Sequence, residues 1–420
     1  MKILVVGKGG REHALVQALA DAPTKAQLFC YPGSDAIATL AATLQVDGMD
    51  GLLAWIGNER PDVVVAGEEV WLVQGEGLAN ACQRMGVPCW GPHKESARLE
   101  ASKEFAKQFM LRHRIPTGGY AAVATRDEAR AAIGGRYPTV LKFDGLAAGK
   151  GVAVCPDAAA AEEFLDAVFV RKQFGDGRVL VEEFLSGPEI SIFASVCDGR
   201  YHILCPARDY KRLGDGDAGP NTGGMGAVAG RGLVDEATLA VIEESIVKRT
   251  VDGLASDGLP YRGFLYFGIM LTSGGPKILE YNCRFGDPEC QAVMPLVKGD
   301  FAGYVRSGAR GELDPGLIDF SDGWSVCVVL ASAGYPATAR KGDRIAGLGE
   351  VATPARVYHA GTRRNPAGQF ETNGGRVLAV VAPGESRRAA ALAAHAEADK
   401  VTFDGAQRRR DIGLAGFGDG

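Results

Sequence analysis

Glu280 and Asn282 are the residues whose types and spacing best suit a bound metal ion. They stand two apart within residues 277–282, a stretch that we expect to form a β-strand. Side chains two apart on a strand point to the same face, about 7 Å from one another. Carboxylate and amide oxygens are hard ligands, and two of them side by side suit magnesium bound together with a nucleotide. The pattern therefore predicts a metal site on this strand.

A dense charged loop follows directly, with the sequence Arg284-Phe285-Gly286-Asp287-Pro288-Glu289. It carries an arginine and two acids held by a glycine and a proline. A charged loop of this kind after a buried strand is more often a site than a solvated turn. Upstream, residues 208–212 form a mixed-charge stretch and residues 217–226 a glycine-rich one. These upstream stretches are, taken alone, equally consistent with a long disordered loop.

The first glycine-rich turn has the sequence Gly7-Lys8-Gly9-Gly10-Arg11-Glu12, between an expected strand and an expected helix. Glu12 stands where a dinucleotide fingerprint needs its third glycine, which disfavours an NAD site. A helix N-terminus with free N–H groups beside Arg11 suits a phosphate monoester. A tight turn that serves packing alone is an equally good interpretation.

A second glycine loop covers residues 144–151. The spacing before Gly149-Lys150 is one residue short of a Walker A motif, and Gly151 replaces the hydroxyl residue, so a P-loop NTPase is disfavoured. A glycine loop between two strands, flanked by Lys142 and Lys150, could still close over a triphosphate. The alternative is a surface hairpin with two solvated lysines.

A binding slot for adenine needs an apolar wall, hydrogen-bonding groups and a group that holds the ribose hydroxyls. The strand end at residues 182–185 and the nearby Glu189 could supply all three, although solvated carboxylates at a strand end explain this segment better when it is taken alone. The sequence has no HExxH or GxSxG motif. Electrostatic handling of phosphate is therefore favoured over covalent protein chemistry.

The elements that must position these residues fall into four groups. Alternating apolar runs and helical segments in the first hundred residues predict a parallel, doubly wound sheet, with strands at 3–6, 63–66 and 87–90 and helices at 12–20, 70–85 and 94–113. A small α+β subdomain follows, with strands at 139–142, 151–154 and 178–183 and a helix at 158–169. The third group is an antiparallel sheet covered by a helix at 236–255, with strands expected at 190–196, 201–205, 263–272 and 277–282. The last group is a strand-rich part that begins at 324 and ends in a helix at 386–400.

Composition limits the function classes. The chain has 420 residues and a net charge of −5, which gives no reason to expect nucleic-acid binding. Its nine cysteines are an odd number without a CxxC pair, which favours reduced thiols in the cytoplasm. No stretch reaches the ~18 apolar residues of a membrane span. The apolar run at the start of the sequence is too short for a signal peptide. We expect a cytoplasmic protein without a membrane partner.

Taken in order, several motifs together resemble the phosphoribosylamine glycine ligase family of the ATP-grasp superfamily. The most specific are Gly-Pro-Asn-Thr-Gly-Gly-Met-Gly-Ala at 219–227 and Glu-Tyr-Asn-Cys-Arg-Phe-Gly-Asp-Pro-Glu at 280–289. Others lie at 7–14, 102–105, 142–152, 182–185, 359–362, 372–376 and 410–413, so the likeness covers essentially the whole chain. Lys8, Phe143 and the run Gly67-Glu68-Glu69 depart from the pattern expected of the family.

The resemblance implies a multidomain α/β and α+β fold. Its parts would be an N-terminal parallel α/β domain (1–101), an ATP-grasp domain (102–323) with an inserted lid at about 120–189, and a C-terminal domain (324–420). The implied enzyme joins glycine to 5-phosphoribosylamine through glycyl phosphate, giving glycinamide ribonucleotide, ADP and phosphate in purine synthesis. We expect ATP and magnesium, or manganese in its place, and a monomer or weak dimer.

The resemblance also implies a role for each site residue. The lysines that would meet the phosphates are Lys103, Lys142 and Lys150. The nucleotide's base and ribose would lie against Glu182, Glu183, Phe184, Leu185 and Glu189, and the metal would lie on Glu280 and Asn282. Catalytic roles fall to Arg284, Asp287 and Asp217, and the other substrate contacts to Gly9, Gly10, Arg11, Asn221, Thr222, Gly223 and Gly224.

Three rival interpretations remain open at this stage. The nearest is another ATP-grasp carboxylate–amine ligase or a carboxylase. A dinucleotide-dependent oxidoreductase is opposed by Glu12, and an inactive scaffold is opposed by the intact lysine set together with Glu280 and Asn282.

Overall fold

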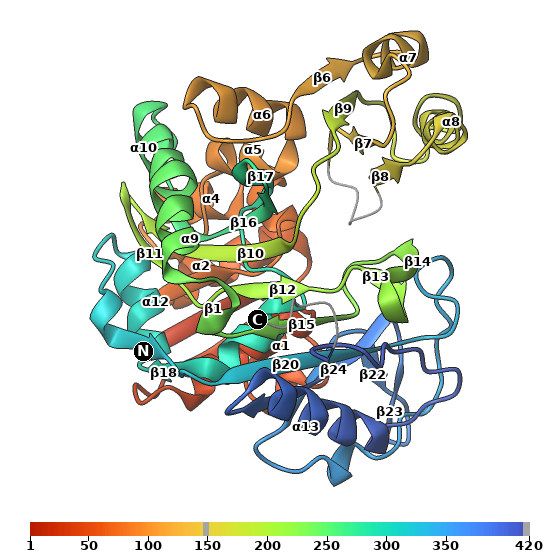
Figure 1. The fold of residues 1–420 in the computed structure, drawn as a ribbon. Helices are drawn as coiled ribbons and strands as arrows, with labels where there is room; N and C mark the ends of the chain where they lie inside the picture. The colour runs from red at the N-terminus through yellow and green to blue at the C-terminus, as the bar shows by residue number, and fades with distance from the viewer. Residues whose placement is uncertain (146–150, 415–420) are drawn as a thin grey trace.

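The N-terminal part is a five-stranded parallel sheet in the order β3-β2-β1-β4-β5. It is drawn in red and orange in Figure 1, where β1 is labelled. The structure is a computed structural model that describes residues 1–145 and 151–414. Alternate residues of the central strands enter different cores: Ile3 and Val5 pack with α1, whereas Leu4 and Val6 pack with α2 and α4. The doubly wound sheet is thus confirmed. Its elements are β1 Lys2–Gly7, α1 Gly10–Asp21, β2 Gln27–Pro32, β3 Ala42–Thr43, α2 Gly48–Glu59, β4 Val63–Ala66, α3 Val70–Val73, α4 Leu78–Met85 and β5 Cys89–Trp90.

Two helices predicted as continuous are broken, and that part of the prediction was wrong. The helix predicted over 70–85 stops after α3 and resumes at α4, because Gly75 and Gly77 have φ of 57° and 88°, which is left-handed backbone. The helix predicted over 94–113 divides into α5 Lys94–Ala101 and α6 Lys103–Arg112. Ser102 between them accepts a hydrogen bond from Phe105 N (3.1 Å), so it caps a new helix.

The large sheet has nine strands, in the order β17-β16-β10-β12-β15-β20-β24-β21 with β11 paired to β10. All its pairs are antiparallel, and β16 and β17 form a hairpin. The long helix is present with a π-helical turn, Glu243–Val247, between α9 and α10. The elements of this part are β10 Glu189–Cys197, β11 Arg200–Ile203, β12 Ala207–Asp209, β15 Gly226–Ala229, α9 Glu236–Ile242, α10 Lys248–Ser256, β16 Arg262–Thr272, β17 Gly275–Asn282, α11 Glu289–Val293 and α12 Phe301–Ala309.

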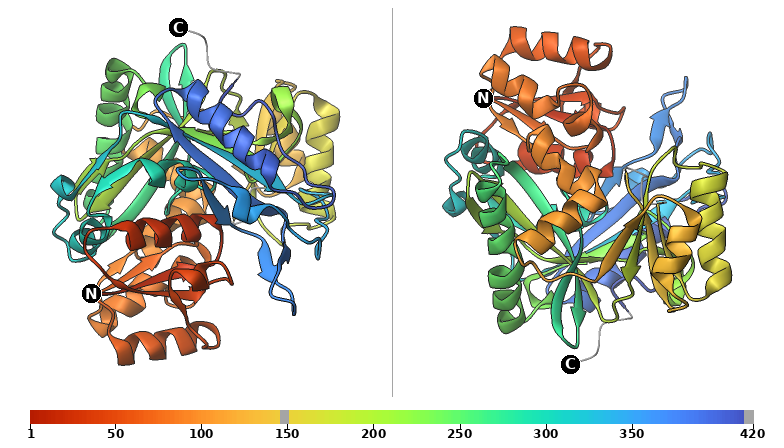
Figure 2. Two further views of the ribbon diagram at one scale, coloured as in Figure 1. Left: turned by 90° about the horizontal axis from the view of Figure 1, so that it is seen from below. Right: turned by 90° about the horizontal axis from the view of Figure 1, so that it is seen from above.

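The lid is a separate four-stranded antiparallel sheet in the order β6-β9-β7-β8, with its own small core. Glu189 begins β10 of the large sheet, so the lid's sheet ends earlier than the expected limit of the lid, at Glu183. Figure 2 shows the lid and the N-terminal sheet as separate lobes against the large sheet. The lid's elements are β6 Tyr120–Val123, α7 Arg126–Ile133, β7 Thr139–Phe143, β8 Val152–Cys155, α8 Ala158–Leu165, a π-helical turn Asp166–Val170 and β9 Val179–Glu183.

The C-terminal part continues the large sheet. Trp324, where we expect the C-terminal domain to begin, is the first residue of β20, and β20 pairs with β15 on one side and β24 on the other. Helix α13 packs on β20 and β24. No helix among residues 1–145 and 151–414 is both long and apolar enough to cross a bilayer. The remaining elements are β13 Arg212–Gly214, β14 Ala218–Asn221, β18 Val297–Gly299, β19 Ile318–Phe320, β20 Trp324–Ala331, β21 Arg356–His359, β22 Thr362–Arg364, β23 Phe370–Thr372, β24 Arg376–Gly384 and α13 Arg387–Lys400.

Candidate active site

A cavity of about 440 Å³ is bounded by loops of the N-terminal sheet, by helices α5 and α6, by the lid and by strands β16 and β17. A volume of this size suits a small-molecule substrate site. The cavity brings together residues that lie far apart in the sequence. The predicted site residues that line it are Arg11, Lys103, Lys142, Glu182, Thr222, Gly223, Glu280, Asn282, Arg284 and Asp287.

Glu280 and Asn282 lie on β17 and both line the cavity, as the period of a strand predicts. Burial raises the pKa of Glu280, but Lys211, Lys142 and Lys103 together hold it below its ordinary value, so the carboxylate is charged. The amide nitrogen of Asn282 donates to Glu100 Oε1 at 3.2 Å. The pair presents the hard oxygen chemistry that magnesium prefers.

The predicted metal site has few protein ligands in the described part of the chain. Residues 1–145 and 151–414 contain no group of three or more His, Cys, Asp or Glu side chains that could hold a metal ion. Magnesium at a nucleotide site is bound by one or two carboxylates plus substrate phosphates. Glu280 and Asn282 therefore fit a metal that arrives with a nucleotide better than a resident structural ion.

Two lysines share one buried carboxylate at the junction of the lid with the body. Glu182 Oε2 lies 2.9 Å from Lys107 Nζ and 3.2 Å from Lys142 Nζ. Lys142 Nζ also donates to Leu279 O at 3.0 Å, which joins β7 of the lid to β17. Burial lowers the pKa of Lys107. Lys107 was not predicted from the sequence, although it follows Lys103 by four residues and so shares its face of the helix.

Lys103 lies at the first residue of α6 and lines the same cavity. Its Nζ donates to Gly145 O at 2.9 Å, at the start of the second glycine loop. Burial lowers its pKa from the ordinary value. Lys150, which we predict to contact phosphate, lies outside the described residues. The described lysines form a cationic wall for an anionic ligand.

The segment predicted to hold adenine is only partly at the cavity. Glu182 lines it, and its buried Oε1 has no hydrogen-bond partner, so this oxygen is an available acceptor. Glu183 is exposed and accepts from Gly119 N at 3.0 Å. Phe184 is 41% exposed, whereas Leu185 is buried. Glu189 forms an ion pair with Lys211.

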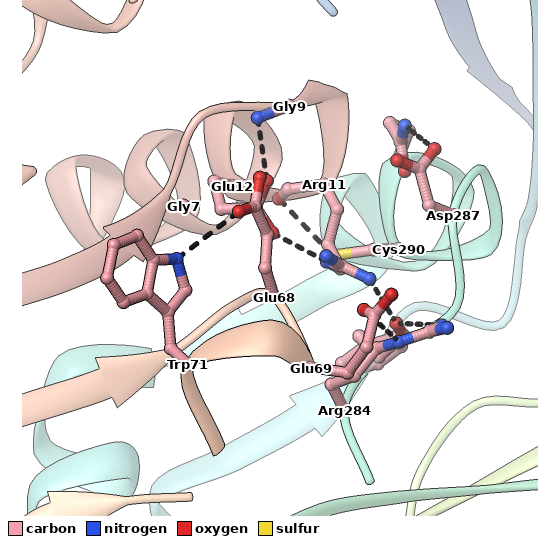
Figure 3. Close-up of polar contacts among 12 residues, drawn as sticks. Gly7, Gly9, Arg11, Glu12, Glu68, Glu69, Trp71, Arg284, Asp287 and Cys290 are labelled. Carbon is pink, nitrogen blue, oxygen red and sulfur yellow. Dashed lines mark hydrogen bonds and ion pairs between the residues drawn. The ribbon is translucent and has the colours of Figure 1, made fainter. Parts of the chain in front are cut away.

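Arg284 is held between two carboxylates where the cavity meets the N-terminal domain. Its Nη2 lies 2.8 Å from Glu100 Oε1. Its Nε lies 3.2 Å from Glu69 Oε2, and Figure 3 shows these two side chains together. Burial raises the pKa of Glu69, yet the cations of Arg284 and Arg11 hold it below its ordinary value. This end of the cavity therefore mixes fixed positive and negative charge.

Arg376 reaches the same end from β24, in the C-terminal part. Its Nη1 donates to Gly223 O (2.6 Å) and to Asp287 O (2.7 Å), and its Nη2 lies 3.3 Å from Asp287 Oδ2. Burial raises the pKa of Asp287, but Arg376 and Arg11 hold it below its ordinary value. Arg376 thus ties the predicted substrate loop to the charged loop after β17.

Several predicted residues do not line the cavity as the structure describes it. Asp217 lies at the β13–β14 turn, where its 62%-exposed carboxylate pairs with Arg409 Nη1 at 2.6 Å. A Cβ on Gly10 would lie 2.7 Å from Gln291 Nε2, so Gly10 packs against α11 instead. The other predicted residues that are not part of the described lining are Gly9, Asn221, Gly224, Glu183, Phe184, Leu185 and Glu189.

Asp209 and Lys211 line the cavity but were not assigned a role from the sequence. Asp209 ends β12, a strand in the middle of the large sheet, and Lys211 follows two residues later. Burial raises the pKa of Asp209 to about 8. Burial lowers the pKa of Lys211, but Asp209 and Glu189 together hold it well above the ordinary value. The sequence feature that could have identified these two residues is the mixed charge of residues 208–212, where an acid and a lysine stand two apart.

Three family models match the chain. They describe the N domain of phosphoribosylglycinamide synthetase over residues 1–100, its ATP-grasp (A) domain over 101–290 and its C domain over 325–415. The phosphoribosylamine–glycine ligase of Caldanaerobacter subterraneus subsp. tengcongensis is 42% identical over an alignment of 422 positions, which covers 99% of this chain and 100% of that protein.

Solved structures agree with this assignment. The crystal structure of phosphoribosylamine–glycine ligase from Thermotoga maritima matches with a TM-score of 0.85 at 35% identity, and the match covers 98% of this chain and 100% of that one. A biotin carboxylase complex from Campylobacter jejuni matches with a TM-score of 0.72 at 17% identity, over 98% of this chain and 94% of that one, which shows likeness of fold alone. With all three domains matched and the likeness running through the whole chain, the protein belongs to the phosphoribosylglycinamide synthetase family.

Proposed function

We propose that the protein joins glycine to 5-phosphoribosylamine at the expense of ATP, through glycyl phosphate, in de novo purine biosynthesis. The products are glycinamide ribonucleotide, ADP and phosphate. The observation that carries the proposal is one cavity with two chemically different ends. One end has lysines beside the Glu280–Asn282 pair, and the other has arginines paired with carboxylates.

The lysine end is where ATP is proposed to bind. A carboxylate is a poor electrophile, so transfer of the γ-phosphoryl group to glycine must come first. Lys103 and Lys142 offset the negative charge that gathers on the phosphates during this transfer. Glu280 and Asn282 would hold magnesium, or manganese in its place, which when bound neutralises phosphate charge. Glu182 Oε1, buried and unpartnered, can accept a hydrogen bond from the nucleotide.

The arginine end is where glycine and the amine are proposed to bind. An amino acid carries both charges, and Arg284 and Asp287 present both complementary charges from one loop. Thr222 and Gly223 close this end beside Arg376. Because water would also destroy glycyl phosphate, the lid and its glycine loop are proposed to exclude water before phosphoryl transfer.

The remaining site assignments stay proposals. They comprise phosphate contact by Lys150, base and ribose contacts by Glu183, Phe184, Leu185 and Glu189, and substrate or catalytic roles for Gly9, Gly10, Arg11, Asp217, Asn221 and Gly224. The domain limits at 101 and 323, and a monomer or weak dimer in the cytoplasm, also remain proposals.

A direct assay tests the proposed function. The protein is mixed with ATP, magnesium, glycine and freshly prepared phosphoribosylamine, and mass spectrometry follows the amide product together with ADP. A second reaction replaces the amine by hydroxylamine, which should trap glycyl phosphate as glycine hydroxamate. Absence of both products from folded protein, or equal turnover with other amino acids in place of glycine, would contradict the proposal.

A further inference from the structure

Glu12 is a buried carboxylate at the start of α1. It stands where a dinucleotide fingerprint has its third glycine, and that comparison gives Glu12 no role. It is only 1% exposed. Two glycines make room for it: a Cβ on Gly7 would lie 2.3 Å from Glu12 Cγ, and a Cβ on Gly67 would lie 2.6 Å from it. The turn is therefore built around this side chain.

Both oxygens of Glu12 are committed to neighbours in the same turn (Figure 3). Oε2 accepts from Gly9 N at 2.7 Å, and Oε1 accepts from Arg11 Nε at 2.6 Å. Hydrogen bonds to an ionised carboxylate are stronger than neutral ones, and a buried ion pair needs such geometry to offset desolvation. Glu12 thus fixes both the backbone of the turn and the direction of the guanidinium of Arg11.

Arg11 passes this constraint to the charged loop after β17. Its Nη1 donates to Phe285 O at 3.3 Å, and Phe285 stands between Arg284 and the Gly286–Asp287 pair. A second contact joins the turn to α11, which follows this loop directly, because Cys290 Sγ lies 3.7 Å from Arg11 O. The turn before α1 is therefore attached to the backbone that carries Arg284 and Asp287.

The charges explain why Arg11 needs its own carboxylate. The cation of Arg11 contributes to the low pKa of both Glu69 and Asp287. These two carboxylates also face Arg284 and Arg376. If Glu12 were uncharged, Arg11 would be drawn more strongly towards Glu69 and Asp287, since attraction between opposite charges is strong in a desolvated site.

We propose that Glu12 is a positioning residue that acts through Arg11 to set the place of Arg284 and Asp287 at the amine and glycine end of the cavity. The inference rests on the proposed function. Within the described part of the chain, Glu12 forms its hydrogen bonds and ion pair with Gly9 and Arg11 and none with the lysines or the Glu280–Asn282 pair, so its effect should fall on one end of the cavity.

The test is Glu12→Gln, which keeps the shape of the side chain. A glutamine has one oxygen, so it can accept from Gly9 or from Arg11, while its amide N–H groups oppose the other donor. We expect the KM for glycine and for phosphoribosylamine to rise about tenfold or more, with the KM for ATP changed by less than about twofold. Glu76→Gln is the matched control, because Glu76 also pairs with an arginine, Arg84, but on the surface.

Two further variants keep the test decisive. In a protein that already carries Arg11→Met, Glu12→Gln should change the KM for glycine and for phosphoribosylamine by less than about twofold, because Glu12 acts through Arg11. Glu12→Asp keeps the charge with a shorter reach and should fall between the wild type and Glu12→Gln. If Glu12→Gln fails to fold, Glu12→Asp alone decides: wild-type KM values for both substrates would overturn the inference.

The possible failures are distinguishable. Equal changes in all three KM values, or effects of Glu12→Gln and Arg11→Met that simply multiply, would overturn the positioning role while leaving the proposed function intact. If the folded wild-type protein makes neither the amide nor the hydroxamate, the proposed function itself is wrong. The wild-type assay is therefore run first.

Discussion

Lys107 Nζ lies 2.9 Å from Glu182 Oε2, and this pair joins helix α6 of the body to strand β9 of the lid. The two side chains are 3% and 5% exposed. Because Lys142 shares the same carboxylate, Glu182 balances two buried ammonium groups. Removal of its charge would take from both lysines the carboxylate with which they pair, which is the costly way to disturb a buried ion pair.

Glu182→Gln should therefore lower the free energy of unfolding by about 3 kcal/mol, measured by urea denaturation. The exposed pair of Glu76 with Arg84 provides the control, since Glu76→Gln should leave the urea midpoint nearly unchanged. Equal midpoints for Glu182→Gln and the wild type would show that the lid junction does not depend on this charge.

Glu280→Gln should lower turnover by about 100-fold or more, with a much smaller effect on nucleotide binding. The reason is that the carboxylate is held charged by Lys211, Lys142 and Lys103 and presents a hard oxygen to the phosphate end. Single-turnover kinetics and calorimetry with ADP separate the two effects. Removal of divalent ions with EDTA should stop wild-type turnover and added magnesium should restore it; near-normal turnover of the variant would exclude Glu280 as a metal ligand.

Arg376→Lys should raise the KM for glycine and phosphoribosylamine about tenfold while the KM for ATP stays close to that of the wild type. A lysine cannot reproduce the fork that holds Gly223 O, Asp287 O and Asp287 Oδ2 together. Steady-state kinetics with each substrate varied in turn measure the change. Arg363→Lys, at an exposed pair with Glu371, is the control; a matching loss there would point to a general effect of the substitution.

His13 should make the protein acid-sensitive. It lies on α1 and faces β21, where its Nδ1 accepts from His359 N at 3.0 Å, and burial lowers its pKa to about 4. A histidine with a lowered folded-state pKa binds its proton more readily in the unfolded chain, so stability is full above about pH 6.5 and is lost as the pH falls towards 4. The free energy of unfolding that His13 contributes falls by about 3 kcal/mol when the pH reaches 4.

His13→Gln can still accept the bond from His359 but cannot titrate. Its free energy of unfolding, measured by denaturant titration at several pH values, should fall less steeply than that of the wild type between pH 6.5 and 4. Parallel curves for the two proteins would contradict a role for His13.

The sequence predicted those parts of the fold and site that depend on local pattern. Period-two spacing placed Glu280 and Asn282 on one face of β17, and alternating strands and helices predicted the parallel sheet correctly. The broken helices were missed because a single Ser102 or a Gly75–Gly77 pair looks tolerable within an apolar helical pattern.

Residues whose roles depend on distant contacts could not be predicted in this way. Arg376 stands 89 positions from Asp287, and nothing near it in the sequence indicates that it lies beside that aspartate. The resemblance implies a catalytic role for Asp217, but no local pattern indicates that Arg409, from the C-terminal part, binds its carboxylate. In the sequence, Lys107 and Lys211 are indistinguishable from solvated surface lysines. Only the folded structure, with the large sheet and the lid in place, brings them to the cavity.

The pairing of β15 with β20 has a practical consequence for dissecting the protein. All four residues of β15 are buried, and β20 covers one edge of that strand. A chain cut before Trp324 would expose this apolar edge with unpaired backbone N–H and C=O groups, which is a template for joining to other chains. Such a truncated protein should aggregate rather than survive as a free catalytic fragment.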